Sequence, residues 1–107
     1  MILEYDITIK AGSEYIVDLV YADDDEQPVD VSGWSVESQI RNAADNYRSY
    51  PFTGTADEEG FHLTMSEEET RALRFAHGVY DVFITDPDGK RWPLIQGSAE
   101  IIPEVTR

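Results

Sequence analysis

Cysteine is absent from the chain, and its absence excludes several kinds of chemistry at once. Disulfide bonds, thiolate zinc sites and thiol nucleophiles all require cysteine. Positive charge is scarce as well: eight Lys and Arg stand against 22 Asp and Glu, which gives a formal net charge of −14. Because such a surface repels a phosphate backbone on average, we expect no direct nucleic-acid binding.

Long apolar runs are also missing. No stretch approaches the roughly 18 residues that a membrane helix needs, and the N-terminus lacks the basic and then apolar pattern of a signal peptide. We therefore expect no membrane contact and a protein that folds in the cytoplasm. The 107 residues suit one hydrophobic core, so the length predicts a single domain that spans residues 1–107.

What the chain does contain is a series of short segments in which apolar and polar residues alternate. This period of two is typical of a β-strand with one buried face. No helical stretch between the segments is long enough for the crossovers of a parallel sheet. The sequence therefore predicts an all-β fold, an immunoglobulin-like antiparallel β-sandwich of seven or eight strands. The clearest of these segments are 3–10, 14–21, 34–41, 61–65 and 79–85.

One short helix and several turns interrupt the strands. Ser66 and Glu69 have the spacing of a capping box, which predicts a helix over about 66–74 that crosses from one sheet to the other at an end of the sandwich. Gly33 marks the entry to a strand, and Gly89 ends the turn signal of residues 86–89. All four named residues are therefore expected to have structural roles.

Two sets of apolar residues are predicted to form the centre of the core. Each set lies on one face of its strand, because its members are an even number of residues apart. We expect the two sets to pack against each other across the sandwich. They are Trp34, Val36 and Ile40 in one strand and Tyr80, Val82 and Ile84 in the other.

No motif predicts catalysis, a metal site or a cofactor. The acidic runs at 23–26, 57–59 and 67–69 lack the spacing of a calcium loop and are typical of solvated turns. His62 and His77, the only histidines, lack the spacing of zinc ligands. Because nucleophile elbows and phosphate-binding glycine loops are missing too, we expect no catalytic, cofactor-binding or metal-ligating residue and no enzymatic activity.

Four aromatic residues are candidates for contact with a partner. Tyr47, Tyr50 and Phe52 lie in an irregular, proline-containing segment that predicts an edge strand, and aromatic residues are enriched at protein interfaces. The same three residues could instead cover the edge of the sandwich, and the sequence leaves both roles open. Trp92 follows two basic residues near a hairpin tip, where it is expected to be partly exposed.

Two segments carry a resemblance to a known family. The first is 28–41, which includes Val29-Asp30-Val31-Ser32-Gly33-Trp34, and the second is 78–82, which reads Gly-Val-Tyr-Asp-Val. They are similar to the small β-sandwich modules of tailed-phage virion proteins, which occur as the N-terminal part of upper baseplate proteins and as stand-alone tail or neck proteins. The resemblance extends over most of the chain through Thr64, Ser66, Glu69, Thr70, Leu73, Gly89, Leu94, Gly97 and Ile101.

This resemblance implies a non-enzymatic structural or assembly protein of a tailed-phage or prophage virion, located in the tail, neck or baseplate. The implied partners are other virion structural proteins, bound through surface contacts or edge-strand pairing. A homo-oligomer or ring in the assembled particle is implied as well, since closed symmetry repeats one interface. The protein would be made in the host bacterial cytoplasm and act in the virion.

Two other functions stay open. An acidic DNA mimic that inhibits a DNA-binding enzyme would use the negative charge, but mimicry needs carboxylates spaced like phosphates, whereas here they bunch at predicted turns. Salt-sensitive binding to a DNA-processing enzyme would favour this function. A carbohydrate-binding or receptor-binding sandwich would use exposed aromatic rings, and glycan binding that depends on Trp92 or Tyr50 would favour it.

Overall fold

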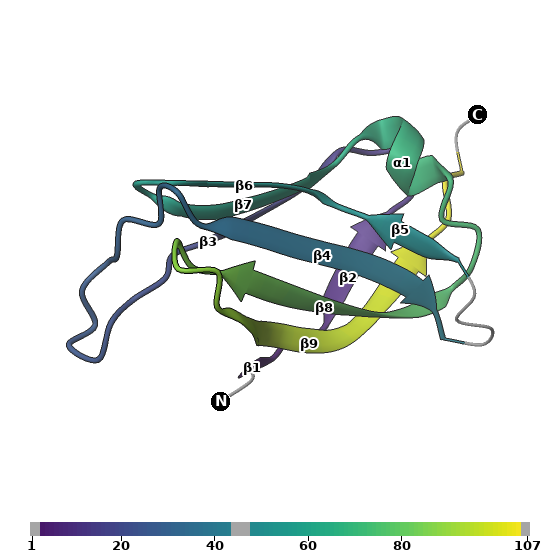
Figure 1. Ribbon diagram of the computed structural model, residues 1–107. Helices are drawn as coiled ribbons and strands as arrows, with labels where there is room; N and C mark the ends of the chain where they lie inside the picture. The colour runs from purple at the N-terminus through teal and green to yellow at the C-terminus, as the bar shows by residue number, and fades with distance from the viewer. Residues whose placement is uncertain (1–2, 44–47, 106–107) are drawn as a thin grey trace.

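The computed structural model describes residues 3–43 and 48–105, which form two packed β-sheets and one short helix (Figure 1). The predicted all-β sandwich is confirmed. Within the described residues the chain has nine strands, because the segment 3–10 is divided in two and a sheet change at Phe52 separates two further strands. The elements are β1 (Leu3–Glu4), β2 (Ile7–Lys10), β3 (Tyr15–Leu19), β4 (Ser35–Asn42), β5 (Ser49–Pro51), β6 (Thr53–Asp57), β7 (Gly60–Met65), α1 (Glu67–Arg71), β8 (His77–Thr85) and β9 (Arg91–Ile102).

The larger sheet has the strand order β1-β9-β8-β4-β5, with β2 also paired to β9, and the smaller sheet has the order β3-β7-β6. In immunoglobulin lettering, β4, β5, β8 and β9 correspond to strands C, C′, F and G, and β3, β7 and β6 to strands B, E and D. One detail differs from the antiparallel prediction: β1 and β2 run parallel to β9. Alternation in a sequence defines a strand's faces but not the direction of its neighbour.

The two predicted core sets are neighbours within one sheet rather than opposite each other. β4 pairs with β8, which places Val36 beside Ile84 and Ile40 beside Tyr80. The expectation that they pack across the sandwich is therefore wrong, since even spacing identifies a shared face and not the facing strand. Both sets do face the core, and the smaller sheet contributes the buried residues opposite them, namely Phe61, Leu63 and Met65.

Trp34 lies at the entry to β4, as predicted, and it joins an aromatic cluster that links the two sheets. Its ring centroid lies 5.4 Å from that of Tyr21, 6.1 Å from Phe61 and 5.8 Å from Trp92. Phe61 is fully buried at the centre of this cluster. Gly33 before Trp34 and Gly89 in the β8–β9 turn both have positive φ angles, as residues of tight turns.

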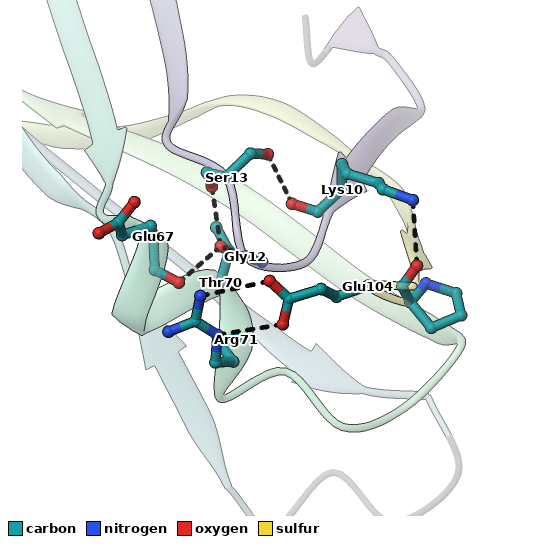
Figure 2. Close-up of polar contacts among 8 residues, drawn as sticks. Lys10, Gly12, Ser13, Glu67, Thr70, Arg71 and Glu104 are labelled. Carbon is teal, nitrogen blue, oxygen red and sulfur yellow. Dashed lines mark hydrogen bonds and ion pairs between the residues drawn. The ribbon is translucent and has the colours of Figure 1, made fainter. Parts of the chain in front are cut away.

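Helix α1 leads from the smaller sheet to the larger one, as the capping box predicted. Ser66 accepts the Glu69 N–H, and the Glu69 carboxylate accepts the Ser66 N–H. Thr70 is fully buried and ties the helix to the loop between β2 and β3 (Figure 2). Its hydroxyl oxygen accepts the Gly12 N–H at an N···O distance of 3.1 Å. The same hydroxyl donates to the Ser13 carbonyl oxygen at an O···O distance of 2.8 Å.

Candidate protein interface

β3 forms an unpaired edge of the smaller sheet. Within the described residues it pairs with β7 alone, so the N–H and C=O groups on its other side have no partner strand. A row of such groups is a template on which another strand can pair. The edge is five residues long in the free chain, which is close to the usual length of a strand.

The carboxylate of Asp18 is the one side-chain protection of this edge. Tyr15, Val17 and Leu19 are half-buried toward the core, while Ile16 and the following Val20 are 54% and 67% exposed. Natural edge strands are usually protected by Lys, Pro or a bulge. β3 contains no Lys or Pro, and its pairing with β7 runs without a register shift.

Among the described residues no strand of the larger sheet pairs with the free side of β3, and we call this boundary between β3 and Tyr5 the open seam. Tyr5 is 63% exposed and shares a small apolar cavity with Val17 and Leu19. The Tyr80 hydroxyl donates to the Tyr5 carbonyl oxygen, and burial raises the pKa of Tyr80 to about 12. The main chain of Tyr5 is thus fixed at the seam while its ring faces solvent.

The opposite seam, between β4 and β6, is closed by the chain itself. The Phe52 N–H donates to the Ser38 carbonyl oxygen at 2.9 Å where the chain passes from β5 to β6. β6 then runs so close to β4 that a Cβ on Gly54 would lie 2.7 Å from the Val36 carbonyl oxygen. The sandwich is therefore closed on one side and open along β3.

Charge distinguishes the smaller sheet from the rest of the chain. No Lys or Arg occurs in residues 11–40 or 49–70, and these segments contain the whole of β3, β6 and β7. His62 is the one residue of these strands that can carry a positive charge. The β3 edge accordingly lies in an acidic surface.

His62 joins all three strands of this sheet. Its Nδ1 lies 2.7 Å from Oδ1 of Asp18 in β3, and its Nε2 lies 2.9 Å from Oδ1 of Asp57 in β6. A neutral imidazole carries one N–H, so it can donate to only one of the two carboxylates. The hydrogen bonds to both carboxylates raise the pKa of His62 to about 8.

This arrangement predicts a pH-dependent stability. The folded state holds the His62 proton more tightly than the unfolded state, so the stabilisation is complete below the ordinary pKa of 6.5 and is lost as the pH rises through about 8. The melting temperature of the native chain should therefore exceed that of His62→Gln at pH 6, and the difference should shrink by pH 9. Thermal unfolding at several pH values measures it.

His77→Gln is the matched control, because His77 begins β8 in the other sheet. This variant should retain the decline in melting temperature between pH 6 and pH 9. A difference between the native chain and His62→Gln that stays constant over this range would contradict the role given to the Asp18–His62–Asp57 cluster.

The four aromatic residues predicted to contact a partner differ in how far they are buried. Tyr47 lies outside the described residues. Phe52 is a core residue with 8% exposure, so the exposed position considered for it is wrong. Tyr50 is half-buried with its ring 5.6 Å from that of Phe75, and Trp92 is half-buried against Trp34. Phe52 thus covers the sandwich, and Tyr50 packs against it with part of its surface exposed.

Two shallow hollows lie on the outer face of the larger sheet. The first has a volume of about 370 Å³ and is lined mainly by polar side chains, among them Glu4, Gln39, Arg41, Asp81 and Gln96. Aromatic rings, which stack on apolar ligand faces, do not stand free in this lining, because its one aromatic residue, Tyr80, is a core residue. In the second hollow the Arg91 guanidinium covers the ring of Phe83, 3.9 Å from its centroid, so neither hollow gives the carbohydrate-binding alternative specific support.

The acidic runs lie at both ends of the sandwich. Residues 23–26 lie between β3 and β4 and residues 57–59 at the β6–β7 turn, whereas 67–69 lie in α1 at the opposite end (Figure 1). A DNA mimic needs carboxylates spaced along one continuous surface, so this separation does not favour it. Among the described residues, no group of three His, Asp or Glu is placed to hold a metal ion.

Comparison with known proteins finds no family model and no curated protein that matches the chain. The described residues contain no helix that is long and apolar enough to cross a membrane.

Proposed function

We propose that this chain is a non-enzymatic structural or assembly protein of a tailed-phage or prophage virion, in the tail, neck or baseplate. It acts through contacts with other virion proteins. The observation that carries the proposal is the unpaired β3 edge with its exposed Ile16 and Val20, on a sandwich whose residues 28–41 and 78–82 resemble virion modules.

An open edge suits an assembly subunit better than a free monomer. An unpaired edge with exposed apolar residues invites unwanted pairing in a free protein, and soluble proteins usually protect it. In a virion the edge is covered by a neighbour once assembly is complete. The closed β4–β6 seam leaves the opposite side available for contact through side chains alone, so one copy can meet two different neighbours.

Mass spectrometry of purified particles tests this function. The chain should be present in density-purified particles in a fixed ratio to the other virion proteins, and particles made without its gene should be incomplete. An abundant cytoplasmic protein of the host is the control for contamination. If the chain falls to the level of that contaminant while complete particles form without it, the virion function is wrong.

A further inference from the structure

We propose that the β3 edge is completed by an extended strand of a partner protein in which apolar residues alternate with Lys or Arg. This inference deepens the proposed function, because the partner would be a neighbouring virion protein. It assigns the contact to Tyr15–Leu19 and gives the chemistry of the segment that binds there.

The backbone of β3 supplies the first part of the recognition. Its free side can form the hydrogen bonds of one added strand, because no described strand pairs with it. Side chains of an added strand that point inward would lie beside the half-buried Val17 and Leu19 and the exposed ring of Tyr5. The inward positions of the partner strand must therefore be apolar.

The outer face of β3 supplies the second part. Along this face Glu14, Ile16, Asp18 and Val20 are all exposed, so carboxylates and apolar side chains alternate. Opposite charges and apolar pairs stabilise neighbouring strands when they lie directly across from each other. The matching outer face has Lys or Arg, whose charged ends meet Glu14 and Asp18 and whose apolar stems cover Ile16 and Val20.

Charge argues against a second copy of this chain as the occupant. Two β3 strands paired antiparallel about Asp18 would place this residue opposite itself, where like charges are destabilising, and pairing about Val17 would place it opposite the apolar Ile16. β3 has no Lys or Arg to relieve the repulsion, and each chain carries a net charge of −14. An acidic strand edge of this kind selects a basic partner strand.

Peptide binding to the full chain tests the inference. The probe is a synthetic peptide of about nine residues in which Val and Ile alternate with Lys, long enough to cover a strand of usual length. The control peptide has Glu in place of Lys. The double variant Ile16→Lys with Val20→Lys adds the positive charges that protect natural edges. Val79→Lys is the matched control, since Val79 is 47% exposed on β8 of the other sheet.

The basic peptide should bind the native chain and Val79→Lys with equal affinity. It should bind the double variant at least tenfold more weakly. Binding should weaken as salt is added, because exposed charges are screened. Backbone hydrogen exchange should slow in Tyr15–Leu19 on binding. Melting temperatures of both variants close to that of the native chain would show that they fold.

Three results of the binding experiment would overturn the inference. The acidic peptide could bind as tightly as the basic one, or the basic peptide could bind the double variant as tightly as the native chain. Slowed hydrogen exchange could also map to the hollow at Gln39 and Arg41 instead of β3. A dimer of the free chain that depends on Ile16 would also overturn it, because the occupant would then be a second copy. Absence of the chain from virions would refute the proposed function alone, since peptide binding is measured on the isolated protein.

Discussion

Replacing Phe61 by Ala will lower the free energy of unfolding by about 3–5 kcal/mol, which is the usual cost of removing a fully buried aromatic ring. Phe61 has no exposed surface, and its ring lies 6.1 Å from Trp34 and 6.2 Å from Tyr21. The variant loses the burial of the ring and leaves a cavity between the two sheets. It also removes the contact through which β7 holds the entry to β4.

Urea or thermal unfolding measures this change. For a domain of this size each kcal/mol corresponds to about 4 °C or more, so the melting temperature should fall by at least ~12 °C. Val79→Ala is the control, and as a substitution of an exposed residue it should change stability by less than about 0.5 kcal/mol. If Phe61→Ala were as mild as the control, the aromatic cluster would not be the centre of the core.

Thr70→Val should cost about 2 kcal/mol although it preserves the shape of the side chain. The substitution removes the acceptor of the Gly12 N–H and the donor to the Ser13 carbonyl oxygen (Figure 2). These groups then lose their hydrogen bonds at the point where the loop from β2 enters β3. Besides lowering stability, Thr70→Val should speed backbone hydrogen exchange at Tyr15, the first residue of β3.

Thr55→Val is the matched control for the hydroxyl, because Thr55 is exposed on β6. It should leave the free energy of unfolding within about 0.5 kcal/mol of the native value. A Thr70→Val protein as stable as Thr55→Val would mean that α1 is held to the sandwich by other contacts, such as the buried Leu73 and the Arg71–Glu104 ion pair.

Local features of the fold could be predicted from the sequence, because neighbouring residues determine them. The capping box needs only Ser66 and Glu69, and the structure contains both of its hydrogen bonds. The turn at Gly89 and the strand entry at Trp34 depend on a few adjacent residues in the same way. In each case the interacting groups lie within one turn, so no knowledge of distant segments is required.

Relations between strands could not be predicted in this way. The alternation that identifies β4 and β8 is the same whether they are neighbours or lie opposite each other, so the pairing of Ile40 with Tyr80 came only from the structure. The Asp18–His62–Asp57 cluster depends on the register of β3 and β6 against β7. Its members have ordinary sequence neighbours and no motif.

The candidate interface was missed for a related reason. The sequence predicts a strand at 14–21 and identifies its inner face, but only the strand order shows that β3 is an edge. One sequence signal was available: no Lys or Arg occurs in residues 11–40, although Ile16 and Val20 occupy the outer face of a strand. Phe52 was predicted at an exposed edge but is buried, because an aromatic residue beside a proline can close a seam as well as present a surface.

Photo-cross-linking in assembled particles tests whether another virion protein covers the β3 edge. A photoreactive amino acid is placed at Ile16 on the β3 edge or, as the control, at Val79 on the larger sheet; both positions are exposed in the free chain. We expect the Ile16 position to link to a different virion protein, within a segment where apolar residues alternate with Lys or Arg. No link from Ile16, or the same link from both positions, would contradict this expectation.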